Sequence, residues 1–229
     1  MLVNKLVNEC KKFILPNHSL VVVREPYIPY IPEQWNKILV LAESQNLSAS
    51  NSKYVEAILS GSSEDRIRRL GASADYIGVY PWDDGSIKLA VEAALQVSSS
   101  NVAVSNAVLW SQRGQNNENT NPDLDLQEMS SKIWSALLAI IEPEKIICCG
   151  KVAQQVIAKT NWNGTIIKLR LPAKTAMSRV SGMFNEADLL KRYPEVEEVL
   201  SRNPNLISSG CRRNKIFYAC HAVSLQTKI

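Results

Sequence analysis

Three polar clusters follow apolar segments of the chain and carry the side chains best suited to chemistry. They are Ala42-Glu43-Ser44-Gln45-Asn46, then Ser105-Asn106, then the segment from Leu171 to Arg179. If these clusters meet at one edge of a sheet, a carboxylate, an amide and a basic loop together have the means to bind and hydrolyse a nucleoside-like group. Glu43 is the acid of the first cluster, and Asn106 both donates and accepts hydrogen bonds, as the edge of a pyrimidine does. Ordinary turn chemistry after each strand is the alternative.

The chain lacks the sequence patterns of several other kinds of site. It contains no G-x-x-x-x-G-K-[ST], G-x-G-x-x-G or G-x-S-x-G segment, so neither a phosphate-binding loop nor a serine-hydrolase elbow is predicted. Its five cysteines form no C-x-x-C pair and it has only two histidines, which argues against a zinc or iron–sulfur site. We therefore expect no metal and no other cofactor.

The elements that must position the three clusters alternate between strand and helix patterns. Strands are predicted over residues 37–42, 101–106, 145–149 and 165–171. Helices are predicted over residues 63–70, 86–97, 124–141, 150–158 and 186–200, the last broken at Pro194, while 215–225 fits either type. Strands that alternate with long helices pair in parallel. The sequence therefore predicts an α/β fold, a three-layer α/β/α sandwich with a mostly parallel central sheet, as a single domain over residues 1–229.

Composition and charge restrict the partners. The chain has 229 residues, 45% of them hydrophobic and 21% charged, which is typical of a globular protein. No apolar run approaches the roughly 20 residues that span a bilayer, and residues 1–16 lack a secretory signal. We therefore expect a cytoplasmic protein without a membrane partner. We also expect it to be a monomer. Residues 168–229 hold eleven Lys or Arg against five Asp or Glu, which favours a polyanionic partner, nucleic acid first.

The order of the clusters resembles the uracil-DNA glycosylase superfamily. Residues 37–46 resemble its first motif, an apolar strand followed by a G-E-A-P-G or G-Q-D-P-Y loop, and residues 104–110 resemble its T-N-x-V-K-C segment. Residues 137–153, which read LLAIIEPEKIICCGKVA, resemble its helix, Pro, strand, Gly-x-x-Ala connection. Residues 170–184 lie where the H-P-S motif and the DNA-penetrating loop would be. The resemblance spans most of the chain, from about residue 37 to residue 184.

The resemblance implies a DNA glycosylase that takes its base out of the duplex before cleaving the glycosidic bond. It implies that Glu43 stabilises the sugar cation or orients a water, that Asn106 reads the base edge, and that Tyr54 stacks on the base. Further base contacts would come from Ser44, Gln45, Asn46 and Leu171. Contacts to DNA would come from Lys174, Met177, Ser178 and Arg179, with Met177 or Arg179 filling the gap left by the flipped base.

The chain also departs from the family pattern. Leu171 stands where the H-P-S histidine would donate to the leaving base, and Ser44 stands where one subgroup has its catalytic Asp. Ala42, Gln45 and Asn46 replace the Gly, Pro and last Gly of the first motif. The iron–sulfur cysteines of another subgroup are missing, with Leu109-Trp110 at the Lys-Cys position, so no cluster is expected.

These departures suggest a different substrate. The stretch 47–50, where the family places a bulky side chain against the thymine methyl, is small and polar apart from Leu47. A roomier pocket would accept a 5-substituted pyrimidine, such as a hypermodified phage cytosine, and would suit an antiviral role. Three alternatives stay open. They are repair of plain uracil, an inactive DNA-binding member of the family, and a hydrolase or transferase that acts on a free nucleoside or another small glycoside. In the third, Asp83 or Asp84 would supply a second carboxylate.

Overall fold

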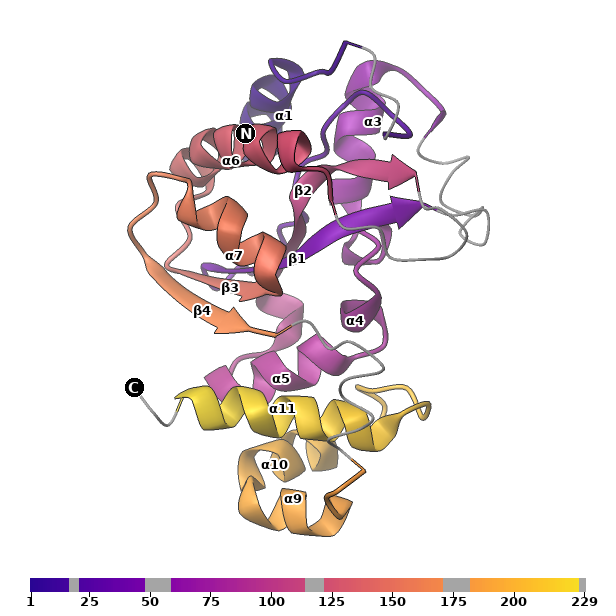
Figure 1. The fold of residues 1–229 in the computed structure, drawn as a ribbon, viewed down its shortest axis with the longest axis vertical. Helices are drawn as coiled ribbons and strands as arrows, with labels where there is room; N and C mark the ends of the chain where they lie inside the picture. Colours follow the sequence, from indigo (N-terminus) through magenta and orange to yellow (C-terminus); the bar gives the residue numbers. More distant parts are fainter. Residues whose placement is uncertain (17–20, 48–58, 114–121, 171–181, 227–229) are drawn as a thin grey trace. The chain divides into compact units, whose positions relative to one another are not determined.

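The computed structural model describes residues 1–16, 21–47, 59–113, 122–170 and 182–226. The chain forms two compact units, each assembled from two stretches of sequence (Figure 1). Unit 1 comprises residues 1–79 and 102–170, and unit 2 comprises residues 80–101 and 171–229. The single domain expected from the sequence stays a prediction.

An all-parallel, four-stranded sheet forms the centre of unit 1. Its strands are β1 (Ile38–Leu47), β2 (Ala103–Arg113), β3 (Lys145–Cys149) and β4 (Thr165–Leu169), in the order β2-β1-β3-β4. The first five residues of β1 are buried on both faces, as in other parallel sheets that helices cover. The predicted α/β class with a parallel central sheet flanked by helices is confirmed, and it is consistent with a three-layer α/β/α sandwich.

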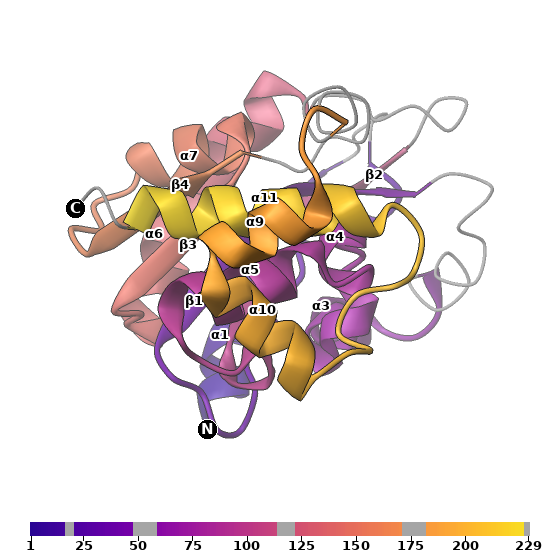
Figure 2. The same ribbon diagram turned by 90° about the horizontal axis from the view of Figure 1, so that it is seen from below.

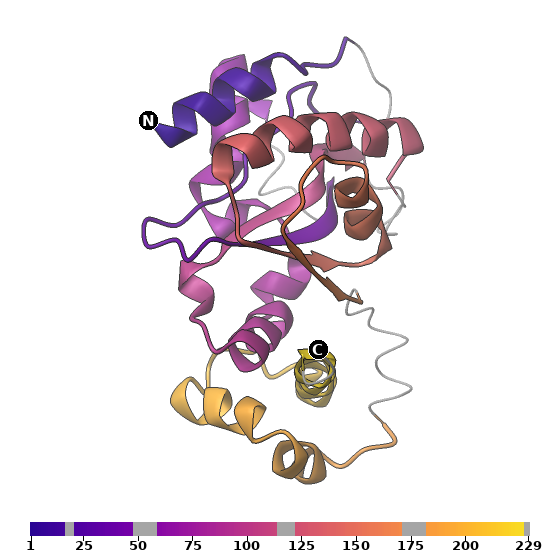
Figure 3. The same ribbon diagram turned by 90° about the vertical axis from the view of Figure 1, so that its left-hand side faces the viewer.

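The helices of unit 1 place apolar stripes against the sheet and against one another. They are α1 (Leu2–Lys11), α3 (Ser63–Arg69), α6 (Leu124–Ile141) and α7 (Lys151–Ala158), with short 3-10 turns η2 (Leu70–Ala72) and η3 (Ala74–Tyr76). α6 packs against β2, α7 packs against β1, β2 and β3, and α1 packs against α6 (Figure 3). The bounds predicted for α6 and β3 are confirmed. α3 begins after Ser62, which caps it in a capping box with Asp65.

The predicted ends of the first two strands are wrong. β1 continues past Ala42 to Leu47, and β2 continues past Asn106 to Arg113. The polar residues that suggested turns lie inside the strands because partners within unit 1 satisfy most of their hydrogen bonds. Gln45, for example, donates from Nε2 to the Tyr76 carbonyl at 3.1 Å.

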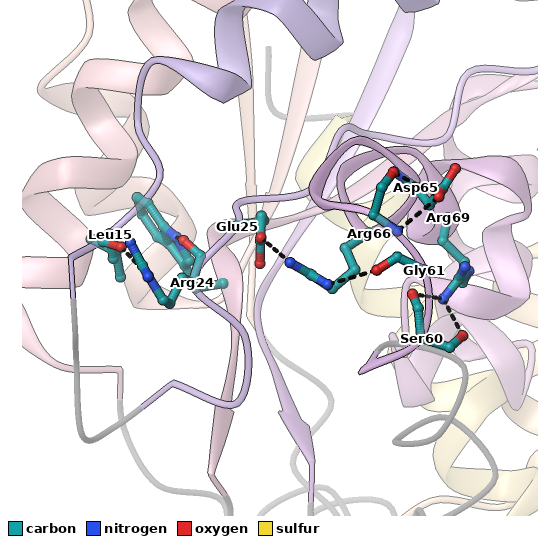
Figure 4. A network of polar contacts seen from close by, with 10 residues as sticks. Leu15, Arg24, Glu25, Ser60, Gly61, Asp65, Arg66 and Arg69 are labelled. Atoms are coloured by element: carbon teal, nitrogen blue, oxygen red, sulfur yellow. Dashed lines mark hydrogen bonds and ion pairs between the residues drawn. The ribbon is translucent and has the colours of Figure 1, made fainter.

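An extended segment, residues 22–30, covers the outer edge of β2. Its N–H groups donate to carbonyls of β2 at 2.8 Å from Val22, 3.0 Å from Tyr27 and 3.0 Å from Tyr30, which protects an edge that would otherwise be open. Glu25 of this segment is 7% exposed and bonds Arg66 of α3 at 2.5 Å (Figure 4). Burial raises the pKa of Glu25, but the hydrogen bond and the charge of Arg66 outweigh burial, so the pKa lies below its ordinary value.

Unit 2 is helical in the part that the structure describes (Figure 2). Its helices are α4 (Tyr80–Asp83), α5 (Ser86–Leu95), α9 (Glu186–Arg192), α10 (Pro194–Arg202) and α11 (Arg212–Gln226), with a 3-10 turn η4 (Ser99–Asn101). α11 packs against α5 and α9, and α10 packs against α5. The predicted break at Pro194 is confirmed, and the ambiguous residues 215–225 are helical because they supply the buried face of α11.

Candidate functional site

Glu43 lies in β1 two residues past Leu41, the last residue of β1 that pairs with the shorter strand β3. The direction in which the chain crosses the sheet changes between these two strands. The chain passes from β1 to its neighbour β2 on one side, and from β3 to its neighbour β4 on the other side. In open α/β sheets, ligands bind beyond the carboxyl ends of the strands at such a switch point. The carboxyl ends of β1 and β3 are therefore the candidate site.

The first turn of α7 holds the Glu43 carboxylate. Its Oε1 accepts a hydrogen bond from the Val152 N–H at 3.3 Å, and the amino end of a helix favours a negative charge. Gly150 has a φ of 100°, a conformation that favours glycine. A Cβ at this position would also lie 2.4 Å from Oε1 and would displace the carboxylate. Among the residues that the structure describes, Oε1 is the only atom of this half-buried carboxylate with a hydrogen-bond partner. Oε2 is thus available to a water or a substrate.

The same turn fixes the end of β4. The carbonyl oxygen of Leu169 accepts from the Gly150 N–H at 2.9 Å and from the Gln154 side-chain amide at 3.2 Å. The position of Glu43 and the point at which the chain leaves β4 are therefore set by one structural element. The sequence predicts a helix that begins at Gly150 but gives no local signal for the close approach of Glu43, which is 107 residues away in the chain.

Asn106 lies inside β2 and is fully buried. Its Nδ2 donates to the Tyr27 hydroxyl at 2.9 Å and to the Ile77 carbonyl at 3.1 Å, which uses both of its N–H bonds. Its Oδ1 is buried and has no hydrogen-bond partner among the described residues. The Tyr27 hydroxyl in turn donates to the Val108 carbonyl at 3.3 Å, and burial raises the pKa of Tyr27 far above its ordinary value. The phenol therefore stays neutral and keeps its donor role.

The structure does not bring Glu43 and Asn106 to the same face of the sheet. Ala42 pairs with Asn106, so these two side chains share one face, and Glu43 as the next residue points to the other. The contacts agree with this, since Glu43 reaches α7 whereas Asn106 reaches Ile77 in the connection between β1 and β2.

The other first-motif residues belong to β1. Gln45 is 2% exposed, and its Oε1 accepts a hydrogen bond from the Ser111 hydroxyl, so both ends of its amide are used inside unit 1. Ser44 is half-buried and pairs with Val108 in β2. Asn46 pairs with Gln112, and its side chain is outside the described part of the structure. Gln45 is therefore a structural residue in this arrangement.

Six predicted site residues lie outside the residues that the structure describes. They are Tyr54, Leu171, Lys174, Met177, Ser178 and Arg179. In sequence, Tyr54 follows β1 and the other five follow β4. The roles predicted for all six stay predictions, as does the pocket size inferred from residues 47–50.

The remaining titratable groups do not form a second centre in the described ranges. Among these residues there is no group of three or more His, Cys, Asp or Glu side chains placed to hold a metal ion. Burial raises the pKa of Cys10, Cys148 and Cys220 to about 12, so these thiols stay protonated. Asp84 accepts hydrogen bonds from the N–H and hydroxyl of Ser86 at 2.8 and 2.6 Å, so its carboxylate is engaged at the start of α5.

A scan of protein-family models and a search of curated proteins gave no match for this chain. Membership of the uracil-DNA glycosylase superfamily therefore stays a prediction. Of the helices that the structure describes, none is both long enough and apolar enough to cross a membrane.

Proposed function

We propose that this protein is a DNA glycosylase that hydrolyses the N-glycosidic bond of a flipped-out pyrimidine and leaves an abasic site. The substrate we propose is a 5-substituted base, such as a hypermodified cytosine, rather than plain uracil. The observation that carries the proposal is the position of Glu43, a half-buried carboxylate at the switch point of a parallel sheet with one oxygen anchored to α7. The excess of positive charge in residues 168–229 supports DNA as the partner.

Glu43 is the residue that acts on the sugar. When the bond between C1′ and the base nitrogen breaks, the electron pair leaves with the base and positive charge develops on the sugar. The Glu43 carboxylate stabilises that cation and orients a water through Oε2, while the Val152 amide keeps Oε1 in place. The water oxygen bonds to C1′, its proton passes through the carboxylate to solvent, and the departing base takes a proton from solvent.

Asn106 does not read the base in this proposal, in contrast to the role that the resemblance implies. Its side chain points to the face of the sheet opposite Glu43, and the base is bonded directly to the sugar carbon on which Glu43 acts. Its N–H groups are committed to Tyr27 and Ile77, and its Oδ1 is buried. We therefore assign Asn106 a structural role, in which it ties β2 to Tyr27 and Ile77.

The test is an abasic-site assay with alkali cleavage as its readout. Duplexes and single strands would carry uracil, 5-hydroxymethylcytosine, glucosylated 5-hydroxymethylcytosine or unmodified cytosine. We expect strand breaks with a modified cytosine, and a loss of about 100-fold or more in the Glu43→Gln variant. Glu144→Gln is the matched control, since Glu144 is an exposed glutamate just before β3 and should have no effect.

Two results would contradict the proposal. Full activity in Glu43→Gln would refute the site. The absence of breaks with every base, together with salt-sensitive DNA binding, would instead favour an inactive DNA-binding protein, and Leu171 in place of the histidine donor would be its physical explanation.

A further inference from the structure

A hollow of about 220 Å³ lies between α9 and α11 in unit 2. Three aromatic residues line it, namely Phe184, Tyr193 and Phe217, together with Asp188 and Arg192 of α9. The volume is below the roughly 300 Å³ at which sites for drug-sized ligands begin, so the hollow suits a single planar ring system. A lining that combines aromatic rings with charged side chains suits a flat, polar ligand.

The aromatic side chains offer an open stacking surface. The rings of Phe184 and Phe217 are stacked, with centroids 5.4 Å apart and an interplanar angle of 28°. Phe184 is nevertheless 42% exposed, and its neighbour Met183 is 81% exposed. The exposed part of the Phe184 ring is therefore accessible to a flat ligand.

The charges around the hollow are suited to a nucleotide. Arg192 lies beside the hollow and Arg213 lines a wider surface depression that shares Phe184. Among the described residues, neither arginine forms an ion pair with a carboxylate, whereas Arg212 next in the chain pairs with Glu186 at 3.1 Å. The Arg192 guanidinium lies over the Tyr193 ring, 5.8 Å from its centroid. Guanidinium groups bind phosphate through their N–H groups, and contact with a ring face is compatible with that role. Asp188 has no ion pair in the described part either, and a carboxylate accepts from the exocyclic amine of a base.

We propose that this hollow binds one nucleotide of single-stranded DNA. The base stacks on the exposed side of Phe184, Asp188 accepts a hydrogen bond from its amine, and Arg192 and Arg213 contact the flanking phosphates. Base stacking on an aromatic residue tolerates any sequence, and the carboxylate adds a preference for bases that carry an amine. This site is separate from Glu43, and only the choice of DNA over other nucleic acids rests on the proposed function.

The test uses short fluorescent oligonucleotides and the full chain, with binding followed by fluorescence anisotropy over a range of salt. Phe184→Ala should weaken binding about 10-fold through loss of one stacked base. Arg213→Ala should weaken binding to every sequence and lower the slope of log K against log salt by about 0.7. Asp188→Asn should remove a preference for oligo-dC over oligo-dT, because thymine lacks the amine. Arg202→Ala of α10 is the matched control and should bind as wild type.

The three test residues are exposed, so their variants should retain the circular dichroism spectrum of the wild type. Affinities of Phe184→Ala and Arg213→Ala equal to that of Arg202→Ala would overturn the site, and tighter binding of an RNA oligonucleotide would overturn the assignment to DNA. The binding measurement involves none of the residues assigned to catalysis. A negative abasic-site assay would therefore leave this result intact, and the two proposals fail separately.

Discussion

Replacing Gly150 by Ala should disturb both the stability of unit 1 and the position of Glu43. The backbone at Gly150 has φ 100° and ψ 169°, a region open almost only to glycine, and another residue there costs about 1 to 3 kcal/mol. The new Cβ would also lie 2.4 Å from the Glu43 Oε1, so the carboxylate has to leave the Val152 amide. Loss of that hydrogen bond adds about 1 kcal/mol. The free energy of unfolding should therefore fall by about 2 to 4 kcal/mol.

The assay is urea unfolding followed by tryptophan fluorescence, since four of the five tryptophans belong to unit 1. A double-mutant cycle separates the two contributions. In a Glu43→Ala background the clash is gone and only the backbone strain remains, so Gly150→Ala should cost about 1 kcal/mol less than in the wild type. Gly210→Ala is the matched control, because a Cβ at Gly210 meets no atom within 4 Å.

Two results would refute this reasoning. If Gly150→Ala were as stable as Gly210→Ala, the backbone at residue 150 would not have the conformation described. If Gly150→Ala cost the same with and without Glu43, the carboxylate would not lie against this turn, and the anchoring of Glu43 by α7 would be wrong.

Three further predictions concern the rest of the molecule. Ser62→Ala removes the capping box that starts α3 and should lower the free energy of unfolding by about 1 kcal/mol in the same urea assay. Because Arg66 holds the pKa of Glu25 below its ordinary value, the pair stabilises the fold at neutral pH and this stabilisation is lost as the pH falls below about 4.5. Glu25→Gln should therefore be less stable than wild type at pH 7 and lose less stability between pH 5 and pH 3; parallel acid profiles would contradict this. A thiol reagent should modify one cysteine rapidly in the native protein, the exposed Cys211, and all five in denaturant.

The fold could be predicted from the sequence to the extent that local patterns determine it. The apolar periodicity of residues 124–141 and the turn at Pro143 fix α6 and β3, and Pro194 interrupts a helix because it has no N–H to donate. The ends of β1 and β2 could not be predicted, because the polar residues after Ala42 and Ser105 find partners that are distant in sequence. Tyr27 is 79 residues from Asn106, and no local pattern links them.

The candidate site, like the fold, could be predicted only where a local sequence pattern determines it. Glu43 follows an apolar run, and the alternation of strands and helices predicts a parallel sheet with that run in one of its strands. Both the residue and its approximate location could therefore be predicted from the sequence. The face to which each side chain points depends on the register of β1 against β2. Single-residue alternation then separates Glu43 from Asn106, and the sequence, with both residues near expected strand ends, gave no indication of this separation.

Whether a second carboxyl group accompanies Glu43 also determines which glycosidic bond it would cleave. Cleavage of a sugar–oxygen bond with retention requires two carboxylates about 5 Å apart, one of which protonates the leaving oxygen. Of the two candidates for the second carboxylate, Asp83 is exposed in α4, and Asp84 accepts hydrogen bonds from Ser86 at the start of α5. Among the described residues, no carboxyl group is hydrogen-bonded to Glu43. A carboxylate that acts alone stabilises a sugar cation but supplies no acid to the leaving group. A nucleobase spreads the departing electron pair over its ring and carbonyl or imine groups, so it needs that acid far less than an alkoxide does. The arrangement around Glu43 is therefore better matched to an N-glycosidic bond than to the bond of a small O-glycoside.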